Sequence, residues 1–531
     1  MRTVREAVLD VLRARGMTTV FGNPGSTELP MLKQFPEDFR YVLGLQEAVV
    51  VGMADGFALA SGTTALVNLH TGPGTGNAMG AILNARANRT PMVVTAGQQV
   101  RAMLTMEALL SNPQSTLLPQ PAVKWAYEPP RPADVAPALA RAVQLAETPP
   151  HGPVFVSLPM DDFDAELTEA EDRGALTAAA RRVTHVTGPA PDTLQDLADR
   201  IAGARSAVLV VGDDVDASGA WDAVVALAER TGLPVWAAPV SARVAFPRNH
   251  PQFRGELVPA IGPLTRQLSG HDLVVVVGAP VFRYYPYIPG SYLPDGAELI
   301  LLTRDAEEAA RAPVGDAVVA DLALTARALA DRFADPLPTG APAARPEERA
   351  RATEGPDGVL TPLAAMTAIA QGAPAHTLWI NESPSNVPQF HEATRISTPG
   401  SYLFSAGGGL GFGAAAAVGA QLGAPDRPVV AVIGDGSVHY AAAYKIPVTF
   451  VVLSNARYAI LQWFAQIEHA QGAPGLDIPG LDITAIATGY GVRAHTAYGA
   501  GELTKLVRDA AAQQDGPVLI DVPITTELPS L

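Results

Sequence analysis

Short apolar runs alternate along the chain with longer stretches in which apolar residues recur at the three- and four-residue spacing of a helix. Such runs, rich in Val, Ile and Leu, are typical of strands buried on both faces of a parallel sheet, with helices as crossovers. The pattern therefore predicts an α/β protein with parallel sheets flanked by helices. The predicted strands span residues 18–21, 41–45, 65–69, 92–95, 207–211, 235–237, 273–277, 299–302, 377–380, 429–433, 448–453 and 518–522.

Two stretches without such a pattern divide the chain. Residues 161–191 are polar and irregular, and residues 335–357 are rich in Pro, Ala, Glu and Arg. We expect both to be linkers. The predicted domains are therefore 1–180, 190–335 and 358–531, and a length of 531 residues also suits three domains.

The composition narrows the class of protein. There are 53 acidic and 37 basic side chains, and the formal net charge of -16 argues against non-specific binding to nucleic acids or anionic membranes. The absence of cysteine excludes disulfides, thiolate metal sites and cysteine nucleophiles. Residues 1–16 predict a charged amphipathic helix without an apolar signal core, and no apolar run is long enough to span a membrane. We therefore expect a cytoplasmic enzyme that acts on small polar molecules.

Polar residues follow two predicted strands of the last domain. Gly434-Asp435-Gly436-Ser437 comes after residues 429–433, and Ser454-Asn455 comes after residues 448–453. Ligands bind at the carboxyl ends of parallel strands. Glycines let a phosphate approach the backbone, and carboxylate and amide oxygens suit Mg²⁺, which takes its other ligands from phosphate and water. The pattern predicts a magnesium-diphosphate site, with a tight turn and a strand-end cap as the alternative.

The first domain shows the same pattern at four strand ends. The loop Gly22-Asn23-Pro24-Gly25-Ser26, the pair Gln46-Glu47, His70 with the Gly-rich turn 71–76, and residues 97–99 each follow a predicted strand. In one α/β unit these clusters converge on one edge of the sheet. The central domain has comparable turns after residues 207–211 and 273–277, but no Gly-rich helix start follows them. We therefore expect the central domain to be a spacer without an intact cofactor site.

Ten segments, in this order, resemble the thiamine diphosphate-dependent enzymes, and most closely the benzoylformate decarboxylase group. They are FGNPGSTELP, LQEAVVVGMADGFA, NLHTGPGTGNAMGA, TAGQQVRAM, VKWAYEP, HDLVVVVGAPVFRY, EAARAPVGDA, INESPS, GSYLFSAGGGLGFG and VIGDGS. The resemblance covers nearly the whole chain. It implies the thiamine diphosphate-binding fold, with a pyrimidine-binding domain at 1–180, a central α/β domain at 190–335 and a diphosphate- and magnesium-binding domain at 358–531. It also implies a homotetramer built as a dimer of dimers, with each site between the first domain of one subunit and the third domain of another.

The resemblance implies residues that bind thiamine diphosphate and Mg²⁺. Asp435, Asn455 and the backbone carbonyl of Arg457 match the metal ligands. Glu47 matches the glutamate that activates the cofactor by hydrogen bonding to its pyrimidine nitrogen, although the helix dipole also favours a glutamate at a helix N-terminus. Leu410 matches the bulky residue that props the cofactor in its bent form, although core packing would equally explain it. The other matching positions are Asn23, Pro24, Gly25, Asn77, Glu382, Pro384, Ser385, Gly408, Gly409, Gly434, Gly436, Ser437 and Tyr458.

The implied reaction is the non-oxidative decarboxylation of a 2-keto acid to an aldehyde and carbon dioxide, by a lyase whose cofactor ring accepts the released electrons. Ser26 and His70 match the pair that binds the substrate carboxylate and shuttles protons, although an isolated histidine would more often be structural. An apolar pocket lining implies an aryl or branched keto acid such as benzoylformate, as in the mandelate pathway, although single apolar residues are more often core. The matching pocket residues are Leu109, Leu110, Phe404, Ile460, Leu461 and Phe464.

Two positions depart from the family pattern. Asp435 and Asn455 are separated by fewer residues than is usual in the family. Residues 438–445 offer eight positions for a crossover helix, whereas a helix that returns along a six-residue strand needs about 13. We therefore expect a tighter or rearranged crossover. Tyr285 stands where benzoylformate decarboxylases carry a second catalytic histidine. Because a phenol, with a reference pKa of about 10, exchanges protons less readily at neutral pH than an imidazole near 6.5, we expect slower aldehyde release and more carboligation.

Three alternatives remain open. They are a carboligating transferase of the acetolactate synthase type, a protein with this fold whose cofactor site is impaired by the short crossover, and a dehydrogenase that uses the central domain. The match at His70 and at the pocket positions favours the decarboxylase over the transferase. Product analysis, a cofactor titration and a nicotinamide-binding assay would separate the alternatives.

Overall fold

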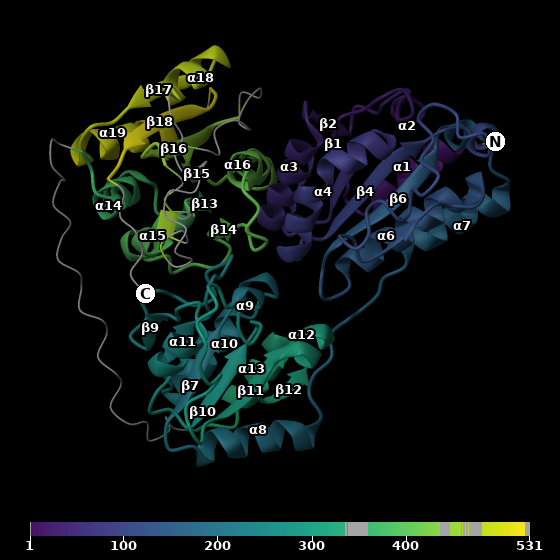
Figure 1. Ribbon diagram of the computed structural model, residues 1–531. Helices are drawn as coiled ribbons and strands as arrows, with labels where there is room; N and C mark the ends of the chain where they lie inside the picture. The colour runs from purple at the N-terminus through teal and green to yellow at the C-terminus, as the bar shows by residue number, and fades with distance from the viewer. Residues whose placement is uncertain are drawn as a thin grey trace.

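The computed structural model describes residues 2–334, 337, 359–435, 446–457, 459, 462–463, 466, 481–513 and 515–525. Within them, three sheets of six parallel strands each are flanked by helices. The predicted α/β class is therefore confirmed. The three units meet at a common junction, with the first domain at the right of Figure 1, the third at the left and the central domain below.

The first sheet has the strand order β2-β1-β3-β4-β6-β5. Its interior strands are almost completely buried, as the continuous apolar runs predict. Its strands are β1 Thr19–Gly22, β2 Arg40–Leu43, β3 Ala65–Leu69, β4 Met92–Gln98, β5 Ala126–Tyr127 and β6 Pro153–Pro159. Its helices are α1 Val4–Ala14, α2 Leu29–Leu32, α3 Glu47–Ser61, α4 Thr71–Ala87, α5 Arg101–Leu104, α6 Val135–Glu147 and α7 Glu169–Ala180.

The second sheet has the order β12-β11-β10-β7-β8-β9. Strands β7, β8 and β9 follow one another towards one edge of the sheet, and β10, β11 and β12 follow one another from the other side of β7 towards the opposite edge. The strand order therefore reverses between the neighbouring strands β7 and β10. Its strands are β7 Ala207–Val211, β8 Val235–Ala237, β9 Phe253–Glu256, β10 Leu273–Val277, β11 Glu298–Thr303 and β12 Asp316–Val319. Its helices are α8 Pro191–Gly203, α9 Asp213–Ala217, α10 Trp221–Thr231, α11 Ile261–Gln267, α12 Ala306–Arg311 and α13 Leu322–Ala330.

The third sheet has the order β14-β13-β15-β16-β18-β17. Strands β15 and β16 are parallel neighbours, with Gly434 opposite Leu453, which confirms the expected pairing of the two apolar runs. The strands are β13 Leu378–Glu382, β14 Tyr402–Phe404, β15 Val429–Gly434, β16 Val448–Ser454, β17 Arg493–Thr496 and β18 Val518–Pro523. The helices are α14 Pro362–Gly372, α15 Val387–Thr394, α16 Phe412–Gly423, α18 Ile483–Gly489 and α19 Ala500–Ala511.

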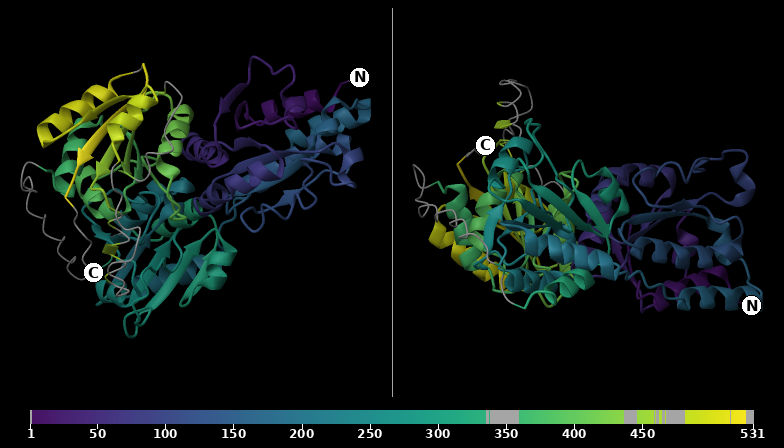
Figure 2. Two further views of the ribbon diagram at one scale, coloured as in Figure 1. Left: turned by 45° about the horizontal axis from the view of Figure 1, so that its top comes forward. Right: turned by 90° about the horizontal axis from the view of Figure 1, so that it is seen from below.

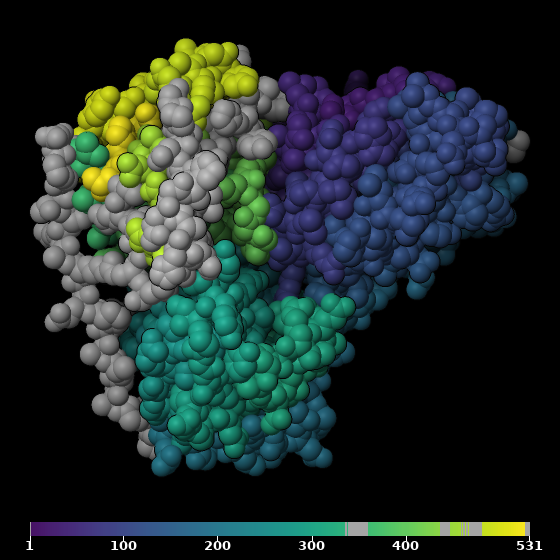
Figure 3. All heavy atoms as spheres, viewed as in Figure 1, coloured from purple at the N-terminus to yellow at the C-terminus, as the bar shows by residue number. Residues whose placement is uncertain are grey.

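Helices α3 and α16 join the first domain to the third through glycines. A β-carbon at Gly56 would lie 2.1 Å from the carbonyl oxygen of Ala416, and one at Gly419 would lie 1.8 Å from that of Met53. The two backbones therefore approach to a distance that only glycine allows at these positions. In the views of Figure 2 and Figure 3 the first domain extends away to one side, while the central and third domains pack against each other.

The prediction that residues 161–191 form a linker is wrong for most of this stretch. Residues 169–180 form α7, which Thr168 and Glu171 begin with a capping box. Its buried residues Ala175 and Ala179 belong to the core of the first domain. With only two buried alanines, and with its one leucine, Leu176, exposed, the helix gave too weak an apolar pattern to be predicted. The proposed linker at 335–357 lies outside the described residues, apart from Leu337.

Among the described residues, no helix is both long enough and apolar enough to cross a membrane.

Candidate active site

Glu47 is the first residue of α3, at the carboxyl edge of the first sheet. The side chain of the preceding Gln46 caps the helix. Glu47 is buried, and both of its carboxylate oxygens accept hydrogen bonds. Asn23 Nδ2 lies 3.0 Å from Oε1, and Asn77 Nδ2 lies 3.1 Å from Oε2. The structure thus brings together three predicted cofactor residues that are far apart in the sequence, and it holds the carboxylate in one orientation.

His70 precedes α4 on the same edge. Its Nδ1 lies 2.8 Å from Glu28 Oε2 and 3.2 Å from Thr27 Oγ1. A β-carbon at Gly25 would lie 2.1 Å from His70 Nδ1, so the loop after β1 can lie against the imidazole ring only because residue 25 is glycine. Ser26, which is exposed, belongs to the same loop. Pro24 lies between Asn23 and Gly25, and the loop therefore connects the Glu47 cluster with His70.

Glu28 is a site residue that the sequence pattern did not reveal. Its side chain is buried, and each carboxylate oxygen accepts two hydrogen bonds. Oε1 accepts from Thr27 Oγ1 and the Gly97 N–H, and Oε2 accepts from the Gly25 N–H and His70 Nδ1, all at 2.8 Å. Its position two residues after Ser26, at a strand end, was the available signal. These contacts also show that the ends of β1, β3 and β4 converge, as predicted.

Tyr285 and the predicted pocket residues are distributed over three sheets. Tyr285 follows β10 in the central domain and is 62% exposed. Leu109 and Leu110 follow α5, and Leu109 is 86% exposed. Phe404 ends β14 and lines a cavity between domains whose lining, within the described residues, includes neither leucine. A common substrate pocket therefore stays a prediction, and Ile460, Leu461 and Phe464 lie outside the described residues.

Asp435 and Asn455 end two neighbouring strands. Asp435 is buried, and its Oδ2 accepts a hydrogen bond of 3.1 Å from the Ala456 N–H in the loop that carries Asn455. Asn455 Oδ1 accepts from the Arg457 N–H at 3.0 Å. The Asp435 carboxylate and the Asn455 amide oxygen thus lie at one sheet edge, and oxygens of this kind are the donors that Mg²⁺ prefers. The donor set therefore fits the metal. Gly434 is described, whereas Gly436, Ser437, Tyr458 and the expected crossover at 438–445 lie outside the described residues.

Glu382 ends β13 and turns its carboxylate towards the start of α16. It accepts hydrogen bonds from the N–H groups of Gly411 and Gly413, where the positive end of the helix dipole favours a negative charge. Pro384 and Ser385 form a short 3₁₀ turn that begins two residues later. Gly408, Gly409 and Leu410 lie in the loop between β14 and α16, and Leu410 is 57% exposed.

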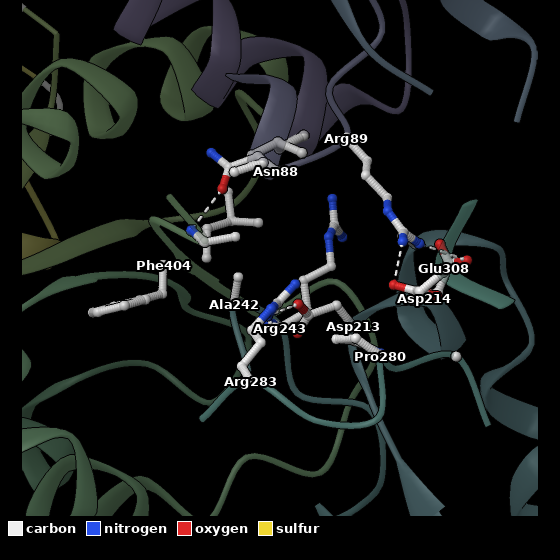
Figure 4. A pocket seen from close by; sticks show the side chains of 16 residues that line it. Asn88, Arg89, Asp213, Asp214, Ala242, Arg243, Pro280, Arg283, Glu308 and Phe404 are labelled. Carbon is white, nitrogen blue, oxygen red and sulfur yellow. Dashed lines mark hydrogen bonds and ion pairs between the residues drawn. The ribbon is translucent and has the colours of Figure 1, made fainter. Parts of the chain in front are cut away.

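The corresponding crevice of the central sheet, where the strand order reverses, is lined by ion-paired side chains (Figure 4). Arg89 of the first domain lies 3.1 Å from Asp214 and 2.6 Å from Glu308, and Arg304 lies 2.8 Å from Asp214. Burial alone would raise the pKa of Asp214, but Arg89 and Arg304 hold it below its usual value. These side chains line a place where doubly wound sheets commonly bind nucleotides. That the central domain is a spacer without a cofactor site stays a prediction.

Comparison with known proteins identifies the class. Family models for the N-terminal, central and C-terminal domains of thiamine pyrophosphate enzymes match residues 2–116, 194–329 and 385–522, respectively. The chain therefore belongs to the thiamine diphosphate enzymes, thiamine pyrophosphate being another name for the same cofactor. The predicted fold and the thiamine diphosphate cofactor, whose usual partner metal in this family is Mg²⁺, are confirmed.

Three proteins that resemble this chain over nearly its full length are decarboxylases. Benzoylformate decarboxylase of Pseudomonas aeruginosa is 50% identical over 536 residues, with 99% of each chain covered. The thiamine diphosphate-dependent 4-hydroxybenzoylformate decarboxylase of Rhodococcus jostii RHA1 matches with a TM-score of 0.94 and 45% identity, over 99% of this chain and 100% of that one. Benzoylformate decarboxylase of Polynucleobacter necessarius matches with a TM-score of 0.95 and 42% identity, over 100% of both chains. The predicted thiamine diphosphate-dependent decarboxylation of a 2-keto acid is thereby confirmed.

Proposed function

We propose that this enzyme converts benzoylformate, or a ring-substituted benzoylformate, into the aryl aldehyde and carbon dioxide. The observation that carries this proposal is its likeness, over nearly the full length of both chains, to the benzoylformate decarboxylase of P. aeruginosa. The relative from R. jostii, which by its title acts on the 4-hydroxy compound, widens the proposal to ring-substituted substrates. Leu109, Leu110 and Phe404, with Ile460, Leu461 and Phe464, are the proposed apolar lining for the aryl ring.

Glu47 is the proposed activating residue. Bound thiamine diphosphate supplies a carbon nucleophile that adds to the keto group and a ring that accepts the electrons released with carbon dioxide. The Glu47 carboxylate would hydrogen-bond the pyrimidine nitrogen, and its orientation is maintained by the amides of Asn23 and Asn77.

His70 and Ser26 are the proposed groups that bind the substrate carboxylate and transfer protons. The hydrogen bonds of His70 described above use Nδ1, so Nε2 is the nitrogen available to the substrate. Ser26 is exposed in the neighbouring loop and has a hydroxyl that can donate to a carboxylate. Tyr285 is proposed to donate a hydrogen bond where the related enzymes have histidine, with slower aldehyde release as the result.

The remaining proposed cofactor residues would hold other parts of thiamine diphosphate and the metal. Asp435, Asn455 and the Arg457 carbonyl would hold Mg²⁺, the glycines that follow β15 would admit the phosphates, and Leu410 would prop the cofactor in its bent form. The other proposed cofactor positions are Gly25, Pro24, Glu382, Pro384, Ser385, Gly408, Gly409, Gly434, Gly436, Ser437 and Tyr458.

The proposed assembly is a homo-oligomer, a dimer of dimers, in which two chains complete each site. Asn77, which bonds Glu47, and Asn84, which bonds Gly409, are seven residues apart on α4. Two helical turns separate them by about 10 Å. The support for sites shared between subunits is membership of the thiamine diphosphate enzymes, for which the sequence resemblance implies such sites. We also propose domain limits of 1–180, 190–335 and 358–531, which each sheet respects, and a cytoplasmic location.

The decisive experiment is a calorimetric titration of the cofactor-free protein with thiamine diphosphate and Mg²⁺, followed by addition of benzoylformate. We expect micromolar binding and the release of carbon dioxide and benzaldehyde. Glu47→Gln should abolish turnover, whereas the exposed Glu37→Gln should not. Binding without release of benzaldehyde would contradict the proposed substrate. Chromatographic detection of acetolactate from pyruvate as the main product would instead favour a transferase.

A further inference from the structure

The loop between β14 and α16 is held by two asparagines of the first domain. Asn84 of α4 forms a pair of hydrogen bonds with the backbone of Gly409: Nδ2 donates to the carbonyl oxygen at 3.1 Å, and Oδ1 accepts from the N–H at 3.2 Å. One turn further along the chain, Asn88 Oδ1 accepts from the Ala406 N–H at 2.8 Å. All three bonds join residues more than 300 positions apart in the sequence.

The far end of the same loop is held from within the third domain, because Glu382 accepts hydrogen bonds from the N–H groups of Gly411 and Gly413. The four anchored positions are therefore 406, 409, 411 and 413. Gly408 and Leu410 lie between them, and Leu410 projects with 57% of its surface exposed. The anchors thus leave accessible the two residues that are proposed to contact the cofactor.

The loop lies close against the Asn84 side chain of α4. A β-carbon at either Gly407 or Gly409 would lie 2.6 Å from Asn84 Oδ1. Gly408 has a φ of +68°, a conformation that costs glycine little and other residues more. The loop therefore follows the surface of α4 at a distance that is set by the Asn84 side chain.

The end of α4 is itself fixed on two further sides. Asn88 Nδ2 donates to the buried Asp55 Oδ2 at 2.8 Å, so its amide cannot rotate without loss of one of its two partners. Arg89 pairs with Asp214 and Glu308 of the central domain, as Figure 4 shows beside Asn88. Since these contacts link the end of α4 with all three domains, Asn84 and Asn88 occupy defined positions relative to the third sheet.

We propose that Asn84 and Asn88 are positioning residues that fix the conformation of the 406–411 loop and its position relative to α4. In that position Leu410 and Gly408 would contact thiamine diphosphate. The proposal rests on the proposed cofactor roles of Gly408 and Leu410 and deepens them. It makes cofactor binding in the third domain dependent on a helix of the first domain of the same chain. Neither asparagine touches the substrate.

Asn84→Ala is the main test, because it removes both bonds to Gly409. Asn84→Asp keeps the acceptor for the Gly409 N–H but places a carboxylate oxygen against the Gly409 carbonyl. In the full-length protein we expect the dissociation constant of thiamine diphosphate with Mg²⁺, measured by calorimetry, to rise about tenfold or more for both variants, since one or two hydrogen bonds are lost. The KM for benzoylformate at saturating cofactor should change less than about threefold.

Gln421→Ala is the matched control. Gln421 Oε1 also accepts from a backbone N–H, that of Val429 at 3.2 Å, and its Nε2 donates to the Arg427 carbonyl at 3.0 Å, but it lies away from the loop. We expect this variant to lower the unfolding temperature without a change in cofactor affinity. If Asn84→Ala fails to fold, Gly407→Ala tests the same contact, because its methyl group would displace the loop from Asn84.

Unchanged cofactor affinity in folded Asn84→Ala or Gly407→Ala would overturn the proposal, and so would an equal loss of affinity in Gln421→Ala. If the unaltered protein binds thiamine diphosphate but does not decarboxylate benzoylformate, the proposed substrate fails, while the comparison of dissociation constants still decides the role of Asn84. Absence of cofactor binding in the unaltered protein would overturn both.

Discussion

The Nδ1 of His70 lies 2.8 Å from the carboxylate of Glu28, which also accepts three other hydrogen bonds. A carboxylate that accepts from one imidazole nitrogen orients the ring and leaves the other nitrogen as the reactive one. We therefore predict that Glu28→Gln lowers the kcat for benzoylformate about tenfold or more. Steady-state kinetics at saturating cofactor would measure this effect.

Glu128→Gln provides a comparison for Glu28. Glu128 belongs to the same domain and accepts hydrogen bonds from Ser115 and Ser157, both at 2.7 Å, without contact to His70. The kcat of Glu128→Gln should stay within about threefold of that of the unaltered enzyme, because the substitution would affect His70 only indirectly. Equal kcat values for the two variants would show that the Glu28–His70 pair has no special role.

Tyr285→His should raise the rate of benzaldehyde release. An imidazole titrates near neutral pH and exchanges protons in both directions, which a phenol does poorly. We expect a higher ratio of free benzaldehyde to carboligation product, measured by chromatography. The matched variant is Tyr287→His, two residues away and 79% exposed, and it should leave the ratio unchanged. A product ratio that is the same in both variants would rule out this explanation of Tyr285.

Gly56→Ala should destabilise the contact between the first and third domains. Its methyl group would lie 2.1 Å from the carbonyl oxygen of Ala416, so the two helices must move apart, at a cost of about 1–3 kcal/mol. Thermal unfolding should begin at a lower temperature. Gly174→Ala in α7, where a β-carbon meets no atom within 4 Å, should be neutral or stabilise by up to about 1 kcal/mol. Similar unfolding temperatures for both variants would contradict the close helix packing.

His391 should make the protein less stable in mild acid. The ring is buried against Phe390 and Tyr402, and neither nitrogen has a hydrogen-bond partner among the described residues. Burial, with a smaller effect from Arg248, holds its pKa well below the usual value of 6.5. Between the folded and unfolded pKa values only the unfolded chain binds the proton, so stability is lost as the pH falls below about 6.5.

The His391 contribution can be isolated by substitution. At pH 5.5 the protonation of one such group in the unfolded chain costs about 1.4 kcal/mol. We expect His391→Phe to lose about that much less stability than the unaltered protein between pH 7.5 and 5.5, as measured by urea unfolding. His495→Gln, at an exposed position, should follow the unaltered protein. An unchanged pH dependence in His391→Phe would mean that the ring is protonated in the folded state.

The sequence by itself determined most of the interior strands, but not β6, which is interior and fully buried and was not predicted. The predictions at 65–69, 207–211, 235–237 and 273–277 coincide with β3, β7, β8 and β10. Because these strands are buried on both faces, nearly every residue in them is apolar, and a continuous apolar run in the sequence predicts each of them. The polar residues at the strand ends of the first domain, and Gly434-Asp435-Gly436-Ser437 in the third, could be predicted as candidate ligand-binding residues for the same reason. They interrupt such apolar runs at the edge of a sheet where ligands bind.

Tertiary structure decided the edge strands and helix α7. Residues of β12 and β17 are largely exposed or partly exposed, and α7 buries only Ala175 and Ala179. Because these elements face water on one side, their sequences need no continuous apolar run. Their conformation depends on the neighbouring strand or helix that supplies the hydrogen bonds and the buried surface.

Tertiary structure also decided the partners within the site. Glu28 meets His70 across 42 positions, and Asn84 meets Gly409 across 325. A local pattern records whether a residue is buried, whereas a contact between distant residues depends on how sheets and domains pack. The sequence therefore indicated which strand ends carry the chemistry. Which side chains hold those ends in place was determined only by packing, within the first domain for Glu28 and His70 and between the first and third domains for Asn84 and Gly409.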